Sequence, residues 1–294
     1  WVVATDYHDD VRISDQIIQG QVDAYRKIRN TMRYLLGNLT GFDESERLDA
    51  SEMPELERAM LHRLKELDTF VREKTAVYDY NPVFQALYQF CVGDLSAFYF
   101  DIRKDRLYCD APTSTRRRAA RTVLDAIFTR LTLWFAPILS FTSEEVWLSR
   151  FGDGAESVHL QQWPETPSSW FDEALASKWA RIKRLRRVIT GSLEVERREK
   201  RIGSSLQAHV ALFVSKETDA ALFDGLDLAE LSITSSAEVV VGSAPETAFT
   251  LDDMDSVAVV TSLASGDKCE RCWTITTDVA ADTGLCHRCT NALA

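Results

Sequence analysis

The sequence has no long uncharged stretch. No run without Asp, Glu, Lys or Arg exceeds 14 residues, the length of the runs at 80–93 and 202–215. A membrane-spanning helix needs about 20 consecutive apolar residues, so we expect neither such a helix nor a membrane partner. No charged-then-apolar signal segment opens the chain, which favours a cytoplasmic location. The first residue is Trp1 rather than Met, which predicts that the chain was cut from a longer protein.

Glycine, proline and cysteine are scarce. Twelve glycines and seven prolines among 294 residues exclude a collagen-like or low-complexity chain. Six cysteines are too few for a disulfide scaffold. At about 150 residues per domain, the length predicts two domains and leaves room for a small third one.

The common catalytic motifs are also absent. The sequence contains no Walker loop, no G-x-G-x-x-G, no H-E-x-x-H and no G-x-S-x-G. None of the five histidines has a recognisable nucleophile or base beside it; they are His8, His62, His159, His209 and His287. We therefore expect no catalytic residue in this chain and a role in binding instead.

Charge is distributed unevenly along the chain. The net charge of −11 argues against a protein that is basic overall and against a DNA partner. Residues 178–201 carry ten Lys or Arg against three Glu, whereas residues 202–294 carry four against fourteen Asp or Glu. A local basic stripe inside an acidic protein can bind a polyanion. A solvated helix face explains the same stripe equally well.

Helical periodicity dominates the first half of the chain. Ser14 and Asp15 are positioned to cap a helix that runs to about Leu39. Its apolar face consists of Ile17, Ile18, Val22, Tyr25, Ile28, Met32, Leu35 and Leu36. The flank of that face carries Arg26, Arg29 and Arg33.

Further helices follow in the same half. A second one has apolar residues from Leu56 to Val71, and Asn81-Pro82 supplies a cap and a first-turn proline for the next. Pro137 is expected to kink or end a later helix, and residues 142–145 suggest a new helix with acids in its first turn. Residues 1–165 are therefore predicted to form an antiparallel helical bundle.

A basic helical segment is predicted at 166–203, after a linker rich in Gly, Ser and Pro at 151–170. Gly191 weakens the prediction that its helix, from about 172 to 201, is unbroken. One face of this helix is apolar and consists of Ile182, Leu185, Ile189 and Leu193. A different face carries Lys183, Arg184, Arg187, Arg198 and Arg201.

Residues 204–262 have the pattern of a small α+β unit. A short helix is predicted at 218–223. Short strands are predicted at 209–214, 231–234, 239–241 and 256–261. The predicted fold class is thus mainly α, with a helical bundle followed by this unit and by a cysteine-containing module at 263–294.

Four of the cysteines form two close pairs. Cys269 and Cys272 are three positions apart, as are Cys286 and Cys289, and thirteen residues separate the two pairs. Two thiolates three positions apart on a tight turn can occupy two corners of a tetrahedron, and a second turn supplies the other two. Four thiolates leave no position for a reactive water, so the pattern predicts one structural Zn²⁺.

Other interpretations of these residues stay open. Disulfides would require an oxidising compartment, and a redox pair would need only one Cys-x-x-Cys. His287 lies inside the second pair and could replace a neighbouring ligand. Trp273 follows the first pair and either packs on it or stacks on a base. Cys91 and Cys109 stand in apolar surroundings that are typical of packed thiols.

A helical bundle, a basic helix and a zinc module together suit the binding of a folded RNA, in which arginines contact phosphates and aromatic rings contact splayed bases. Gly203 favours a phosphate contact at 200–205, because it lets the backbone approach closely. The candidates for RNA contact are Arg26, Arg29, Arg33, Lys183, Arg184, Arg187, Arg198, Lys200, Arg201, Gly203, Ser204, Ser205 and Trp273. For each arginine, pairing with a neighbouring acid on the surface is the alternative.

A series of short strings runs in order along nearly the whole chain. They are WVVATDY at 1–7, DVRIS at 10–14, YRKIRNT at 25–31, LGNL at 36–39, DLSAFY at 94–99, KDRLY at 104–108, APILSFT at 136–142, KRIGSSL at 200–206 and KCERCW at 268–273. Together they resemble bacterial isoleucyl-tRNA synthetases, which belong to class I of the aminoacyl-tRNA synthetases. The CERCW string favours this type over the valyl and methionyl types.

The resemblance implies a C-terminal piece that contains an anticodon-binding domain and binds isoleucine-accepting tRNA as a monomer. The family's ATP-binding signatures, of the His-Ile-Gly-His and Lys-Met-Ser-Lys-Ser type, are absent, as is its editing domain. ATP is therefore expected only in the missing catalytic domain. The intact enzyme esterifies isoleucine to tRNA, and this piece alone should not.

Two other function classes stay open. The cysteine module alone also resembles that of formamidopyrimidine-DNA glycosylases, but those DNA-repair enzymes need an N-terminal proline followed by glutamate, and this chain begins Trp1-Val2. The third class is a scaffold that binds protein partners through the bundle. Salt distinguishes it, because RNA binding weakens steeply with salt and an apolar interface does not.

Overall fold

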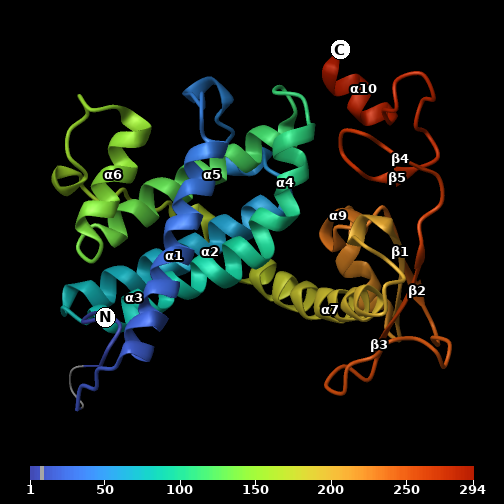
Figure 1. Cartoon of the computed structure of the whole chain (residues 1–294), viewed down its shortest axis with the longest axis horizontal. Helices are drawn as coiled ribbons and strands as arrows, with labels where there is room; N and C mark the ends of the chain where they lie inside the picture. Colours follow the sequence, from blue (N-terminus) through green and yellow to red (C-terminus); the bar gives the residue numbers. More distant parts are fainter. Residues whose placement is uncertain (7–9) are drawn as a thin grey trace. The chain divides into compact units, whose positions relative to one another are not determined.

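The computed structural model describes residues 1–6 and 10–294. These residues form two compact units (Figure 1). The bundle unit consists of Trp1–Leu107 and Pro112–Asp172, and the C-terminal unit consists of Tyr108–Ala111 and Glu173–Ala294. Among the described residues, no helix is both long enough and apolar enough to cross a membrane. The finer division into four parts stays a prediction.

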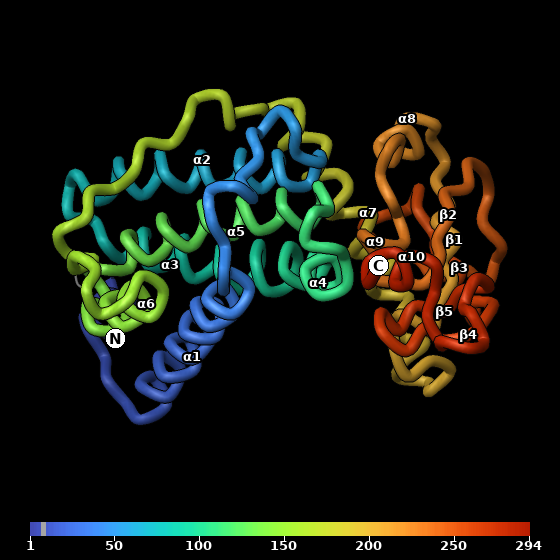
Figure 2. The backbone as a smooth tube through the Cα atoms, turned by 90° about the horizontal axis from the view of Figure 1, so that it is seen from above, coloured from blue at the N-terminus to red at the C-terminus, as the bar shows by residue number. Residues whose placement is uncertain are grey.

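The bundle unit is all helical, as predicted. Its helices are α1 (Asp15–Asn38), α2 (Glu55–Ala76), α3 (Tyr80–Gln89), the π-helical segment η3 (Phe90–Tyr99), α4 (Phe100–Cys109), α5 (Thr115–Phe135) and α6 (Ser140–Phe151). Helix α5 packs against α1, α2 and α6, and α2 also packs against α3 (Figure 2). Its side chains Leu131, Trp134 and Phe135 are buried, so α5 forms the centre of the core.

The apolar face predicted for α1 is buried only in the C-terminal half of the helix. Ile28 and Leu35 are at most 1% exposed, whereas Ile17, Ile18 and Val22 are 37–42% exposed. The predicted cap at Ser14 is confirmed, because its hydroxyl accepts a hydrogen bond from the Ile17 N–H.

Two predicted helix starts in the bundle unit are wrong. Helix α3 begins at Tyr80 with Asp79 at the cap position, and the Asn81 side chain instead donates to the Val3 carbonyl. Helix α6 begins at Ser140, two residues before the predicted start. Glu144 therefore lies in the second turn, where its carboxylate accepts the N–H of Val158 at 2.9 Å.

Residues 152–172, most of the predicted linker, pack along the bundle and belong to that unit (Figure 2). Two 3-10 turns interrupt the segment, at Val158–Leu160 and Ser168–Trp170. Arg130 donates to the Thr166 hydroxyl at 2.9 Å, and Arg72 donates to the Pro164 carbonyl at 2.7 Å. The arginines thereby satisfy the polar groups of a segment that has no regular hydrogen-bond ladder.

The C-terminal unit combines a long helix with a small mixed sheet. Helix α7 (Glu173–Arg198) packs against strands β1 (Ala208–Val214) and β3 (Val257–Leu263). The strand order is β2-β1-β3, where β2 (Ser236–Val241) is parallel and β3 antiparallel to β1. The apolar face predicted for α7 is buried, and the helix continues through Gly191.

One predicted strand is a helix. Residues 231–234 fall in and after α9 (Leu228–Ser232), which follows the short helix α8 (Glu217–Ala220) and the 3-10 turn η7 (Ala221–Phe223). The Asp227 carboxylate accepts the Glu230 N–H and starts α9, and Ile233 ends it in the left-handed conformation with φ 58°. The local cap therefore overrides the strand propensity of the apolar and β-branched residues.

Candidate metal centre and nucleic-acid interface

The four paired cysteines meet at one buried site. Their Sγ atoms all lie within 4.8 Å of one another. The first pair lies on the turn between the short strands β4 (Asp267–Lys268) and β5 (Ile275–Thr276), and the second begins helix α10 (His287–Leu293). Each pair therefore sits on a hydrogen-bonded turn that fixes its spacing.

The geometry fits a tetrahedral zinc ion. Zn–S bonds of about 2.3 Å place neighbouring sulfurs about 3.8 Å apart, and the Sγ atoms of Cys272 and Cys286 are 3.7 Å apart. Burial raises the pKa of Cys269, but backbone hydrogen bonds from Cys272, Cys286 and Arg271 outweigh it and lower the pKa to about 6. The thiolate of Cys269, which is the form that binds metal, is thereby favoured, whereas burial raises the pKa of Cys286 and Cys289.

The alternatives to a four-thiolate site do not fit. None of the six cysteines forms a disulfide. His287 is exposed and stands outside the cysteine cluster, and its backbone N–H donates to Asp278 at 3.1 Å. Cys91 and Cys109 are buried, as predicted for packed thiols.

Trp273 is largely exposed at the end of the cysteine turn. Its side chain is 61% exposed, and its backbone adopts φ 64° at the end of the turn. The Lys268 Nζ lies 5.4 Å from the centre of the indole ring, within the range of a cation–π contact. The ring thus lies beside Lys268 of the cysteine turn with most of its surface exposed, and stacking on a base stays a prediction.

Most of the basic residues on α7 have partners in the C-terminal unit. Arg187 pairs with Asp253, and the Arg184 guanidinium lies 3.6 Å from the Met254 sulfur. Lys183 is half-buried. Arg198 is exposed and has no ion-pair partner among the described residues. The basic stripe is thus partly neutralised along its length, and Arg198 is an exposed residue of it without an ion-pair partner among the described residues.

Residues 200–205 form a compact turn after α7. Lys200 is exposed with φ 59°. Arg201 pairs with Glu196 at 2.5 Å and also with Glu199. The Gly203 N–H donates to the Gln207 side chain at 2.6 Å, so it is already used.

The two serines of this turn also take part in local hydrogen bonds. The Ser204 hydroxyl accepts the Leu206 N–H, and the Ser205 hydroxyl accepts from Arg197 at 2.7 Å. A Cβ at Gly203 would meet only the Gln207 side chain, at 3.5 Å, so the surface there is open. A phosphate could approach this turn, but it would have to replace existing hydrogen bonds.

The three candidate arginines of α1 differ in whether they have an acidic partner. Arg26 pairs with Asp23 at 3.1 Å. Arg29 donates to both carboxylate oxygens of Glu145 on α6, at 3.1 and 3.3 Å. Arg33 is exposed and has no ion-pair partner within residues 1–6 and 10–294.

A second group of arginines, on α5, was missed by the sequence analysis. The RRR run at 116–118 signals it, but the structure shows that Arg118 and Arg121 donate to the Glu46 and Thr40 carbonyls. The loop before α2 is held against α5 in this way.

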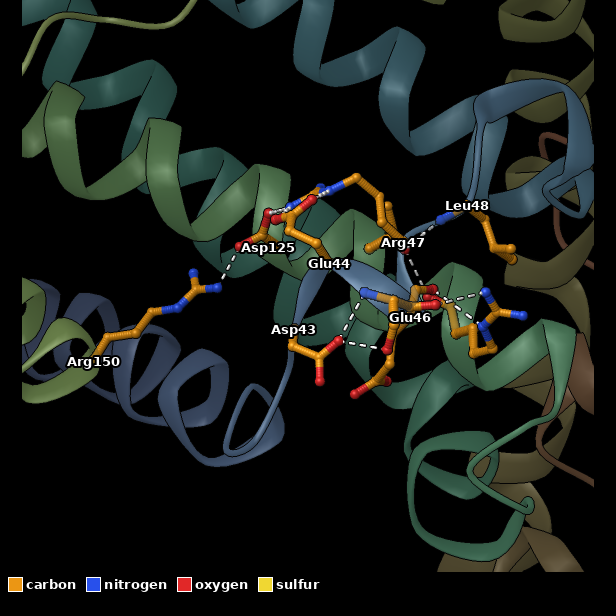
Figure 3. Close-up of polar contacts among 10 residues, drawn as sticks. Asp43, Glu44, Glu46, Arg47, Leu48, Asp125 and Arg150 are labelled. Atoms are coloured by element: carbon orange, nitrogen blue, oxygen red, sulfur yellow. Dashed lines mark hydrogen bonds and ion pairs between the residues drawn. The ribbon is translucent and has the colours of Figure 1, made fainter.

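Figure 3 shows further contacts of this loop. Arg47 pairs with Glu44 at 2.6 Å and with Asp125 of α5 at 2.8 Å, and Arg150 also pairs with Asp125. The Leu48 N–H donates to the Thr122 hydroxyl at 3.2 Å. These charges are engaged within the bundle, so they stabilise the loop rather than present a free basic surface.

Comparison with known families agrees with this architecture. Residues 57–212 match the anticodon-binding domain of tRNA ligase, and residues 266–292 match the zinc finger found in FPG and IleRS. The chain therefore belongs to the anticodon-binding domain family of tRNA ligases, and its four cysteines form a zinc-binding site. The DNA-glycosylase alternative shares only the zinc finger and leaves the bundle unexplained.

Within this class, the similarity is to isoleucine–tRNA ligases. The enzyme of Brucella abortus biovar 1 (strain 9-941) is 51% identical over 282 residues, which cover 96% of this chain and 29% of that protein. The enzyme of Ruegeria pomeroyi is 51% identical over 296 residues, or 100% of this chain and 30% of that protein. This chain is thus a portion of a bacterial isoleucine–tRNA ligase, with its anticodon-binding domain and zinc finger. It spans under a third of the length of these relatives.

Proposed function

We propose that this chain binds isoleucine-accepting tRNA at the anticodon and positions it for ATP-dependent aminoacylation by a catalytic domain outside this chain. The observation that supports the proposal is the match of 57–212 to an anticodon-binding domain, in one chain with the zinc finger at 266–292. Binding energy gained at the anticodon orients the acceptor end, which lowers the entropic cost of reaction at a distant site.

The zinc finger contributes by holding two turns in a fixed geometry. Zinc supplies a closed four-thiolate anchor, because no coordination position remains for water. The residues around it then present Trp273 outward from a rigid turn. An exposed aromatic ring on such a turn is suited to stacking on a splayed base, which is worth about 1–3 kcal/mol per base.

Phosphate contact is assigned to basic residues of α1 and α7 and to the turn at 200–205. Arg33, Arg198 and Lys200 are the strongest candidates, because they are exposed and have no acidic partner among the described residues. Others must exchange a carboxylate or a neighbouring polar group for a phosphate, at an added desolvation cost. These are Arg26, Arg29, Lys183, Arg184, Arg187, Arg201, Gly203, Ser204 and Ser205.

The chain alone is proposed to be inactive and to act as a monomer that uses no DNA partner. Isoleucine-dependent exchange of pyrophosphate into ATP tests the first point. Exchange above background by this chain would show that the activating chemistry lies within it. We expect no exchange by this chain and full exchange by the full-length enzyme.

The binding proposal is tested with unmodified isoleucine tRNA that carries a GAU anticodon, beside the same tRNA with that anticodon replaced. Both are titrated across a salt series. A preference for GAU with a steep salt dependence supports anticodon recognition by this chain. Equal and salt-sensitive binding would assign specificity to the rest of the enzyme. No binding at low salt would favour the scaffold alternative.

A further inference from the structure

A groove of about 530 Å³ lies between the α8–η7 segment and strand β2 of the C-terminal unit. It is lined by neither the cysteines nor the basic residues of α7. Its apolar lining includes Phe223, Leu228 and Val239. A groove of this size can hold a few side chains of a bound chain.

The rim of this groove is acidic. Glu217, Asp224, Asp227 and Glu238 line it, and no Lys or Arg does. Glu217 and Asp224 are exposed and have no ion-pair partner among the described residues. Glu238 lies 3.6 Å from His209 Nε2. Because no Lys or Arg lines the groove, its acidic rim repels RNA and attracts a cationic ligand.

Strand β2 forms one edge of the groove and one edge of the sheet. It pairs only with β1 in the part of the chain that the structure describes, so its outer backbone groups face away from the sheet. Edge strands are commonly protected from pairing by Lys or Pro. The SAEVVV sequence of β2 has neither, and Val241 is 49% exposed.

We propose that this groove binds an extended segment of a protein partner in which Lys or Arg alternates with apolar residues. The segment adds to the sheet beside β2, where backbone hydrogen bonds supply affinity and alternate side chains enter the groove. Its cations pair with Glu217, Asp224 and Glu238. A second copy of this chain does not fit, because it would bring the same acidic rim against itself.

The test uses the full 294-residue chain, labelled with ¹⁵N, and two blocked hexapeptides. One alternates Lys with Val, and the other alternates Glu with Val. We expect the Lys/Val peptide to shift the amides of 217–241 saturably, with weaker binding at higher salt, and the Glu/Val peptide to cause no shift there. No saturable shift with the Lys/Val peptide, or shifts centred elsewhere, would overturn the proposal.

Charge reversal gives a matched control. Asp224→Lys is expected to weaken Lys/Val binding at least tenfold, whereas Glu246→Lys, the same charge change at an exposed site outside the groove, is expected to change it less than twofold. The double variant Asp224→Lys/Glu238→Lys should instead bind the Glu/Val peptide. Such binding would also show that the double variant is folded. Shifts of the groove amides by tRNA would overturn the assignment to a protein partner.

Discussion

Arg103 and Glu57 form a bidentate ion pair in the interior of the bundle. The two hydrogen bonds are 2.6 and 2.7 Å long, and both side chains are at most 5% exposed. The Tyr99 hydroxyl donates to the same carboxylate at 3.1 Å, and burial raises the pKa of Tyr99 well above its usual value. The pair connects α2 to α4 in the unit that contains most of the anticodon-binding match.

Glu57→Gln is expected to destabilise the bundle unit by about 3 kcal/mol, because it leaves a buried guanidinium without its counter-charge. Denaturant unfolding followed by the bundle tryptophans measures the loss. Asp23→Asn is the matched control, since Asp23 forms an exposed pair with Arg26, and its cost is expected to stay below about 0.5 kcal/mol. Equal losses of stability in the two variants would contradict the stabilising role of the buried Arg103–Glu57 pair.

Gly191→Ala is expected to destabilise the C-terminal unit by about 1–3 kcal/mol, although alanine is the better helix former. A Cβ at this position would lie 2.9 Å from two ring atoms of Phe249. Gly20→Ala in α1 meets nothing within 4 Å and should stabilise its helix by about 0.5–1 kcal/mol. Thermal unfolding of both variants distinguishes the contact with Phe249 from the effect of helix propensity.

Cys269→Ser is expected to abolish zinc binding, because three remaining thiolates cannot close the site. Metal analysis of protein purified under reducing conditions should fall from about one zinc per chain to none. Cys91→Ala, which removes a buried thiol of the bundle unit, should leave the zinc content unchanged. Retention of zinc by Cys269→Ser would overturn the ligand assignment.

Arg198→Gln is expected to weaken tRNA binding and to lower the slope of log K against log salt by about 0.7–0.9, the contribution of one phosphate contact. Arg197→Gln is the neighbouring control, because Arg197 already pairs with Glu194 and with the Ser205 hydroxyl. Its effect on the slope should be smaller. An unchanged slope for Arg198→Gln would remove this residue from the interface.

The C-terminal unit should lose stability in acid through Asp219. Hydrogen bonds from Arg181, at 2.6 and 2.8 Å, hold the pKa of Asp219 below its usual value. The contribution is therefore complete above the unfolded-state pKa of about 3.9 and is lost as the pH falls through the lower folded-state pKa. Asp219→Asn should reduce the pH dependence of unfolding in that window, whereas Asp282→Asn, at an exposed site, should not.

Local sequence signals account for the elements that depend on neighbours in the chain. The apolar periodicity located α2 and the buried face of α7, because a helix needs only one apolar stripe to find a core. The spacing of Cys269, Cys272, Cys286 and Cys289 was sufficient for the zinc site, because each pair needs only a tight turn.

Tertiary structure decided the features that depend on distant residues. The basic stripe was visible in the sequence, but only the folded chain shows that Asp253 neutralises Arg187 and that Arg198 stays free, because ion pairs form between residues far apart in sequence. The sequence likewise did not predict the exposure of Trp273 or the packing of 152–172 on Arg72 and Arg130.

The sequence by itself thus determined the helical class, the metal ligands and the family resemblance, since each is encoded in residue type and local spacing. The tertiary structure alone decided which basic side chains are available to RNA and which edge of the sheet stays unpaired. Availability depends on which partners the fold brings into contact, and no local pattern records that.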